Sequence, residues 1–198
     1  MANILILGAG SMGAAFSFPC SDNNHAVSII GTHLENNFID QINSERKHPS
    51  LKCLIEKKVK FLKFEKLSEE MNKKIDLIVI AVSCNGIEWV SVELSKVLKS
   101  SIPILILTKG LAINNNNYEI LAHKMERLLK QNGIKETNIT AAGGPCLAKG
   151  LANKAHTSVV FANTDIKIAK QISKLVSTDY YHVFTSEDIV GVETCAAI

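Results

Sequence analysis

Short apolar runs alternate along the whole chain with longer stretches in which apolar residues recur at helical spacing. Several of the short runs are continuous Ile, Leu and Val, which is typical of parallel strands covered on both faces. We therefore predict eight buried strands. They are Asn3–Leu7, Val27–Ile30, Val59–Leu62, Ile75–Val82, Pro103–Leu107, Asn138–Ala142, Thr157–Phe161 and Tyr180–Phe184.

The longer stretches predict amphipathic helices. In one of them Leu121, Met125 and Leu129 fall on a single helical face. The four-Asn run Asn114–Asn117 predicts a polar loop before that helix. Strands that alternate with helices through right-handed crossovers predict a Rossmann-type α/β fold, with a doubly wound, mostly parallel sheet and helices on both faces. The predicted helices are Leu34–Ile42, Glu65–Met71, Ile87–Leu98, Tyr118–Lys130 and Asp165–Leu175.

Composition narrows the class of protein. The chain has 198 residues, of which 46% are hydrophobic and 21% charged, which indicates one globular domain and excludes disorder. A formal net charge of +3 and 6% aromatic residues argue against nucleic acid as a partner. Five widely spaced cysteines without a CxxC pair predict neither a disulfide framework nor a metal site, and a cytoplasmic location is expected. We expect neither a signal peptide nor a membrane span.

A glycine-rich turn follows the first predicted strand and precedes a helix start. Its sequence, GAGSMG at residues 8–13, has the GxGxxG spacing of dinucleotide-binding sites. Gly8 permits the tight turn, Gly10 lets the backbone approach a pyrophosphate, and Gly13 lets the helix pack on the strand. The helix N-terminus supplies free N–H groups and a positive dipole. The alternative is a glycine turn without a ligand. We expect Pro19 to kink this helix or to end it early.

The tip of the second predicted strand bears on the choice between NAD and NADP, because NAD enzymes hold a carboxylate there for the ribose hydroxyls. No acid stands at this tip, and the nearest one, Glu35, comes late. Thr32 and His33 would donate hydrogen bonds to a 2′-phosphate, so NADP is mildly favoured and NAD is permitted. His33 as an ordinary exposed loop residue is the alternative.

Eight segments spread over nearly the whole chain resemble the NAD(P)-dependent sn-glycerol-3-phosphate dehydrogenase family. TKG followed by GGPxxAK is more specific than the glycine turn, and IIGTHLE and SERKHPSL look closest to archaeal-type members. The segments are GAGSMGAAFSFP, IIGTHLE, INSERKHPSL, IVIAVSCNG, ILTKGL, AAGGPCLAKGLA, TSVVF and SEDIVGVETCAA.

The resemblance implies hydride transfer between C2 of sn-glycerol 3-phosphate and a nicotinamide coenzyme, with dihydroxyacetone phosphate as the ketone. It also admits a homodimer for the full-length enzyme. In the family, the positions of Ser11 and Met12 touch the coenzyme pyrophosphate, and that of Ala148 lies beside the coenzyme.

For the substrate, the resemblance singles out Lys109, Gly144 and Cys146. Lys109 would reach both coenzyme and substrate, since a lysine at the edge of a parallel strand offers a charge to an anion or a developing alkoxide. A solvated turn lysine is the alternative. Gly144 lies in a glycine turn that exposes backbone N–H groups. Cys146 stands where the family usually has Ser or Thr, and a small buried hydrophobe is its alternative interpretation.

The resemblance also implies a domain division, with residues 1–186 as the dinucleotide-binding domain and 187–198 as the start of an interdomain helix. The family's general-base lysine would directly follow Ile198, before a helical substrate domain, so no catalytic residue is assigned here. Such a base contributes typically about 10²–10⁴-fold in rate. We expect these residues to bind coenzyme with little turnover, and to expose apolar surface that favours self-association. Glu193 is interpreted as an interdomain-helix residue.

Two other interpretations stay open. 3-Hydroxyacid and 6-phosphogluconate dehydrogenases also begin with a Rossmann domain, although they are not expected to carry TKGL together with GGPxxAK. A nucleotide-binding module without catalytic activity would need no further domain. Reading the coding sequence past Ile198 discriminates, because an in-frame Lys-Asn continuation favours the dehydrogenase and an immediate stop favours the module.

Overall fold

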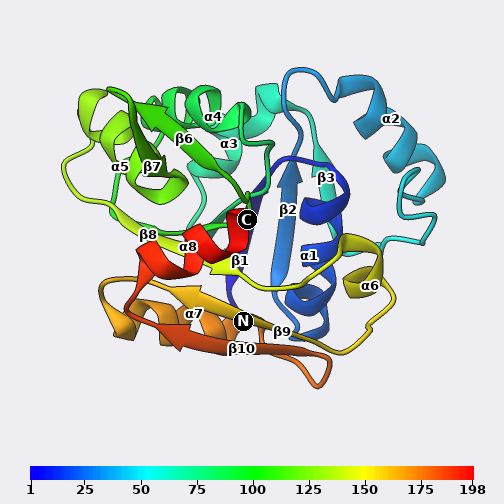
Figure 1. Cartoon of the computed structure of the whole chain (residues 1–198). Coiled ribbons are helices and arrows are strands. Elements are labelled where there is room, and N and C mark those ends of the chain that lie inside the picture. Colours follow the sequence, from blue (N-terminus) through cyan, green and yellow to red (C-terminus); the bar gives the residue numbers. More distant parts are fainter.

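A sheet of eight strands forms the centre of the protein, whose computed structural model describes residues 1–198 (Figure 1). All eight predicted runs form strands, and their ends shift by no more than two residues. The strands are β1 (Asn3–Leu7), β2 (Ala26–Ile30), β3 (Lys60–Leu62), β4 (Leu77–Ile80), β5 (Pro103–Ile106), β8 (Asn138–Gly143), β9 (Thr157–Ala162) and β10 (Tyr181–Ser186).

The strand order across the sheet is β10-β9-β8-β5-β4-β1-β2-β3. The six strands from β3 to β8 are parallel, β9 runs antiparallel to β8, and β10 is parallel to β9. The six parallel strands follow the order of the doubly wound dinucleotide-binding fold, with a switch point between β1 and β4 where ligands bind. The predicted fold class is confirmed.

Helices cover both faces of the sheet. They are α1 (Ser11–Asp22), α2 (Asn36–Glu45), α3 (Leu67–Met71), preceded by a 3₁₀ turn over Phe64–Lys66, α4 (Gly86–Ser95), α5 (Leu121–Gln131), α6 (Ala148–Ala152), α7 (Ile166–Val176) and α8 (Ile189–Ala197). Helices α1, α2, α6 and α7 pack on one face, and α3, α4, α5 and α8 on the other. None of the helices combines the length and the apolar character that crossing a membrane requires.

The continuous apolar runs are explained by this double covering. Successive residues of a strand point to opposite faces, so in β1 Ile4 and Ile6 pack towards α1 while Leu5 and Leu7 pack towards α4 and α5. All four side chains are buried. The outer strand β10 is covered on one face only, and Phe184 stays exposed on the other.

The expectation for Pro19 is partly wrong, because α1 does not end early but continues to Asp22. Proline removes one hydrogen-bond donor from the helix. The buried side chains of Phe16 and Cys20 pack into the core on either side of it and keep the helical path.

The polar loop predicted at Asn114–Asn117 is also wrong. The chain forms an antiparallel hairpin of β6 (Leu111–Asn114) and β7 (Asn117–Ile120), and α5 begins only at Leu121. Asn115 and Asn116 form its turn with φ of 48° and 63°. Positive φ at both central residues fits a type I′ hairpin turn, and Asn tolerates this conformation better than most residues.

Candidate functional site

The glycine turn after β1 lies at the switch point of the sheet, and packing dictates two of its three glycines. Gly8 has a φ of +112°, and a Cβ there would lie 2.6 Å from the carbonyl oxygen of Ala81, just after β4. A Cβ on Gly13 would lie 2.1 Å from the carbonyl oxygen of Gly8. Any side chain at these positions would therefore push α1 or β4 away from the turn.

Gly10 differs, because it faces open space. The nearest atom to a Cβ built on it is Oε1 of Glu35, 4.0 Å away. Gly10 is also the N-cap of α1 and has no side chain to satisfy the first N–H groups of the helix. Those of Ser11 and Met12 have no partner within the helix, and no acidic residue stands in the first turn. This cradle of free N–H groups fits a phosphate.

A cavity of about 440 Å³ opens beside the turn and brings together four of the residues predicted to bind the coenzyme, Gly8, Gly10, Thr32 and His33. Trp89 of α4 also lines it, with its ring centroid 4.9 Å from that of His33. Sequence reasoning missed Trp89. The available signal was its place in the helix that follows β4, the strand beside β1 at the switch point. The other lining residues are Leu34, Glu35, Ala81, Val82, Ser83, Asn85 and Gly86.

Glu35, which comes late in the sequence, folds back so that its carboxylate lies at the strand tip. Oε2 of Glu35 accepts the N–H of Thr32 at 2.6 Å and the N–H of Ala9 at 3.2 Å. The backbone N–H of Glu35 donates in turn to the carbonyl of Thr32 at 3.0 Å, which curls the segment back. A Glu side chain that accepts the backbone N–H three residues earlier forms half of a capping box, so the pattern Thr-x-x-Glu in the sequence indicates this turn.

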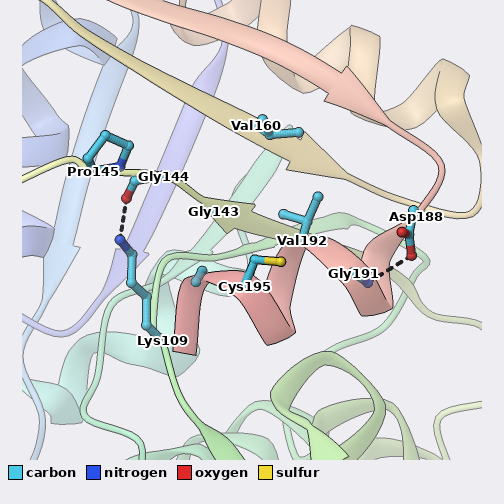
Figure 2. Close-up of a pocket in the computed structure, with 10 residues that line it drawn as sticks. Lys109, Gly143, Gly144, Pro145, Val160, Asp188, Gly191, Val192 and Cys195 are labelled. Atoms are coloured by element: carbon cyan, nitrogen blue, oxygen red, sulfur yellow. Dashed lines mark hydrogen bonds between the residues drawn. The ribbon is translucent and has the colours of Figure 1, made fainter. Parts of the chain in front are cut away.

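Lys109 follows β5 at the same edge of the sheet as the glycine turn, because β1, β4, β5 and β8 are parallel. The hydroxyl of Thr108, just before it, donates to the carbonyl of Val82 at 2.6 Å and ties the exits of β5 and β4 together. Lys109 is exposed, and its Nζ donates to the carbonyl of Gly144 after β8 (Figure 2).

A second cavity, of about 570 Å³, lies between this edge and α8, and both Lys109 and Gly144 line it (Figure 2). Cys146 does not line it. Only 9% of Cys146 is exposed, it belongs to the core cluster that also contains residues of α1, and burial raises the pKa of its thiol. Its environment favours the alternative interpretation of a small buried hydrophobe.

Three further predicted residues, Ser11, Met12 and Ala148, are half-buried and line neither cavity, and the last two pack against the same core cluster. Glu193 also lies away from the second cavity. It is 4% exposed, and its carboxylate accepts the N–H of Ala122 at the start of α5. Packing of α8 on the sheet is close, since a Cβ on Gly143 would lie 2.7 Å from Cγ1 of Val192.

A dinucleotide turn at the switch point of a doubly wound sheet defines the class of this protein as a Rossmann-type dinucleotide-binding domain. The comparison with protein families is more specific. The chain belongs to the family described as the NAD-dependent glycerol-3-phosphate dehydrogenase N-terminus, whose model matches residues 3–169. The family predicted from TKG and GGPxxAK is therefore confirmed, over the related hydroxyacid and phosphogluconate enzymes.

Individual relatives agree with this family. The chain is 29% identical to the NADP(+)-dependent glycerol-3-phosphate dehydrogenase of Archaeoglobus fulgidus and 30% identical to the NAD(P)+ enzyme of Francisella philomiragia, covering 98% of this chain and 56% of each relative. The structure is similar to that of Plasmodium falciparum glycerol-3-phosphate dehydrogenase, with a TM-score of 0.85, 18% identity, and coverage of 98% of this chain and 55% of that one. The chain thus spans about half the length of the curated relatives it matches.

Proposed function

We propose that this chain is the coenzyme-binding domain of a glycerol-3-phosphate dehydrogenase, which transfers a hydride between C2 of sn-glycerol 3-phosphate and the nicotinamide of NAD(P). Membership of the family supports the reaction. The observation that carries the proposal is the placement of two cavities, one at the glycine turn and one at Lys109, along the carboxyl edge of one parallel sheet.

The chain's own residues divide the work between these cavities. The free N–H groups around Gly10, Ser11 and Met12 hold the coenzyme diphosphate, and Trp89 with His33 borders the space for the adenosine end. The bound nicotinamide supplies the hydride chemistry. Lys109 holds the anionic substrate with its ammonium group, which is exposed in the second cavity and now rests on the Gly144 carbonyl.

The domain division belongs to the same proposal. Residues 1–186 form the dinucleotide-binding domain, and 187–198, within which α8 lies, begin the connection to a substrate domain. Support comes from the second cavity, one wall of which is α8 and which opens beside Lys109. A homodimer of the whole enzyme also stays a proposal.

NAD is the coenzyme that the first cavity fits better. The N–H of Thr32, expected to receive a 2′-phosphate, already binds the carboxylate of Glu35. None of the residues that line this cavity is Lys or Arg. A 2′-phosphate would therefore meet a negative charge without a neutralising cation, whereas ribose hydroxyls would find an acceptor. The lining of the first cavity thus favours NAD, against the mild preference for NADP expected from the strand tip.

A coenzyme titration of this chain tests the proposal. Trp89 is the single tryptophan and lines the cavity, so its emission reports occupancy directly. We expect NADH to quench Trp89 and to raise the melting temperature, and NADPH to bind more weakly. Unchanged emission and melting temperature with both coenzymes would overturn the proposed function.

The reaction itself is tested on the whole natural protein that carries these residues. We expect oxidation of sn-glycerol 3-phosphate, and we expect K109M to raise KM at least about tenfold by removing a charge from the substrate site. K149M is the matched control, because Lys149 is an exposed lysine that does not line this cavity. A whole protein that binds coenzyme but turns over no substrate would favour the nucleotide-binding module.

A further inference from the structure

A fully buried histidine touches the glycine turn from outside both cavities. His48 is 0% exposed and lies in the segment between α2 and β3. Its Nε2 is 3.2 Å from the carbonyl oxygen of Ala9, and its Nδ1 accepts the N–H of Leu51 at 3.2 Å. Because Nδ1 uses its lone pair on Leu51, the ring proton resides on Nε2, which donates to Ala9.

The segment that carries His48 is anchored independently of the turn. The backbone N–H of His48 donates to the carbonyl of Cys53 at 3.1 Å, and the His48 carbonyl accepts the N–H of Lys52 at 2.8 Å. The ring also packs edge-on against Phe38, with centroids 5.0 Å apart. These contacts fix the imidazole before any ligand arrives.

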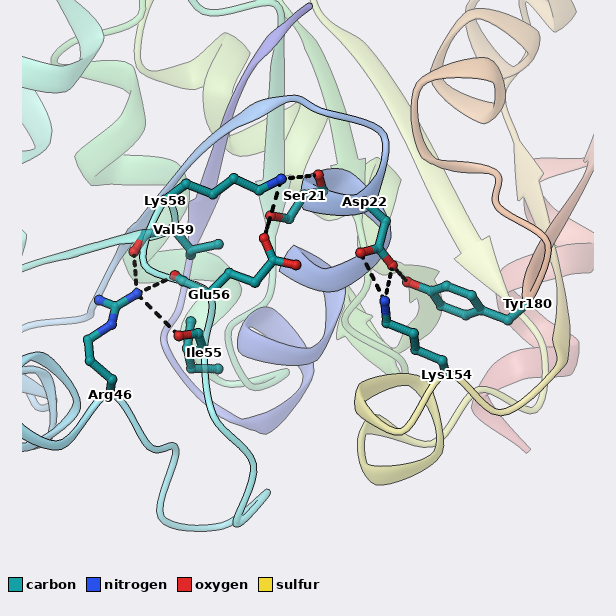
Figure 3. Close-up of polar contacts among 9 residues, drawn as sticks. All are labelled: Ser21, Asp22, Arg46, Ile55, Glu56, Lys58, Val59, Lys154 and Tyr180. Atoms are coloured by element: carbon teal, nitrogen blue, oxygen red, sulfur yellow. Dashed lines mark hydrogen bonds and ion pairs between the residues drawn. The ribbon is translucent and has the colours of Figure 1, made fainter.

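The far end of the same segment is tied to the C-terminal end of α1 (Figure 3). Nη2 of Arg46 donates to the carbonyl of Val59 at 3.1 Å, which holds the two ends of the segment together. The hydroxyl of Ser21 donates to Oε2 of Glu56 at 2.7 Å, and Nζ of Lys58 donates to the Ser21 carbonyl at 2.7 Å.

The bond to Ala9 has a consequence for Gly10. The carbonyl of Ala9 and the N–H of Gly10 belong to one peptide unit, which is planar and trans, so the two groups point in opposite directions. While His48 draws the carbonyl inward, the Gly10 N–H is turned outward. That N–H donates to no acceptor in the protein, and a Cβ on Gly10 would meet only open space.

Ala9 is also held from its other side, since its N–H donates to Oε2 of Glu35. The glycines on both sides of Ala9 restrict the orientation of the adjoining peptide units less than other residues would. Two side chains from the region after β2 therefore fix the peptide units on either side of Ala9. Of the two, only His48 sets the direction of the donor at Gly10.

We propose that His48 is a positioning residue for the coenzyme diphosphate: it holds the Ala9 carbonyl and so aims the Gly10 N–H at the phosphate oxygens. This proposal rests on the proposed function of the site. His48 does not touch the ligand. Its effect is confined to ligands that carry a diphosphate, and this separates it from a residue that merely stabilises the fold.

Two substitutions test the two hydrogen bonds of the His48 ring separately. H48Q places an amide NH₂ near the position of Nε2 and keeps a donor for Ala9, whereas H48N keeps an acceptor near Nδ1 for Leu51 and cannot reach Ala9. Trp89 emission is followed with NADH, ADP and adenosine. We expect H48N to bind NADH and ADP about tenfold more weakly, H48Q to stay within about threefold of the unchanged chain, and adenosine to bind all three alike.

The affinities are compared only among variants that fold, and thermal unfolding without ligand establishes which variants do. Folded H48N that binds ADP as tightly as the unchanged chain would overturn the proposal, as would an equal loss for ADP and adenosine. If H48N does not fold, the ¹⁵N shifts of His48 in the unchanged chain decide, because a proton on Nδ1 contradicts the proposed bond and a proton on Nε2 supports it. An unchanged chain that binds none of the three ligands would instead refute the proposed function.

Discussion

Oε2 of Glu193 accepts the N–H of Ala122 at 3.0 Å, so that the helix α8 caps the first turn of α5 from the side. Helix α5 has no cap of its own, because the side chain of its N-cap residue Ile120 carries no acceptor. The second carboxylate oxygen of Glu193 is buried without a partner. Burial raises the pKa of Glu193 to about 7, although the N–H groups at the start of α5 act in the opposite direction.

The first prediction concerns the pH dependence of stability. The pKa of Glu193 in the folded state exceeds its ordinary value of 4.5, so between about pH 4.5 and 7 the folded state retains a proton that the unfolded state releases. Stability from this group is therefore complete at low pH and falls as the pH rises through this window, by about 3 kcal/mol in total. E193Q keeps an acceptor for Ala122 and should flatten the slope. Urea unfolding across the window measures it.

E187Q is the matched control for this prediction, because Glu187 precedes the same helix but is exposed. The control should retain the slope of the unchanged chain. If E193Q and E187Q behave alike, Glu193 is not the titrating group.

His48 predicts a slope of the opposite sign. Burial lowers the pKa of His48 below its ordinary value of 6.5, although its bond to Ala9 acts the other way. As the pH falls through 6.5, the unfolded state binds a proton before the folded state does, so stability is lost towards acid. H48Q does not titrate here, and the difference in unfolding free energy between H48Q and the unchanged chain should shrink as the pH falls from 7.5 to 5. H33Q replaces an exposed histidine and should leave the acid slope in place.

The sheet could be predicted because strands buried on both faces consist of continuous apolar residues, as in Leu77–Ile80. Such a run is recognised from neighbouring residues alone, without knowledge of distant contacts. The glycine turn and Lys109 could be predicted because each sequence motif directly follows a predicted strand, β1 and β5 respectively. Glu35 was misplaced because a local turn folds it back by three residues. His48 and Trp89 were missed since their roles depend on contacts across 39 residues and on strand order.

The glycine turn offers a matched pair of alanine substitutions. In G13A the new Cβ would lie 2.1 Å from the Gly8 carbonyl, so the helix has to move, and we expect a loss of about 3 kcal/mol of stability. In G10A the Cβ meets only open space and φ is −62°, which alanine adopts freely, so stability should change by less than about 1 kcal/mol.

The G10A variant should lose coenzyme affinity although it keeps its stability. The methyl group of G10A occupies the space through which the diphosphate approaches, and we expect NADH affinity to fall at least about tenfold in this folded variant. Thermal unfolding and Trp89 emission provide the two measurements. A G10A variant with normal affinity would place the diphosphate elsewhere.

The hairpin that replaced the expected loop can be tested at its turn. Asn116 has a φ of 63°, which glycine adopts without strain and which β-branched residues avoid. N116G creates the Asn-Gly pair preferred in type I′ turns and should stabilise the protein by about 0.5 kcal/mol, whereas N116V should destabilise it by about 1–2 kcal/mol. Thermal unfolding of both variants checks the order. Equal stabilities would mean that the turn is not a type I′ turn.

The last prediction concerns the choice of coenzyme. E35Q removes the negative charge from the first cavity but keeps an oxygen that accepts the N–H groups of Thr32 and Ala9, so the turn should keep its shape. A 2′-phosphate placed near this carboxylate is repelled, and neutralising it should improve the ratio of NADPH to NADH affinity about tenfold.

D40N is the control, because Asp40 on α2 carries the same charge and does not line the cavity, and its exposed carboxylate pairs with Lys63 at 2.7 Å. Both variants change the net charge of the chain equally, so a long-range effect on the anionic coenzymes would appear in each. An increased affinity ratio in E35Q alone assigns the discrimination to Glu35. A ratio that stays the same in E35Q, or rises equally in D40N, would show that the carboxylate at Thr32 does not face the ribose, and NADP would regain the preference expected from Thr32 and His33.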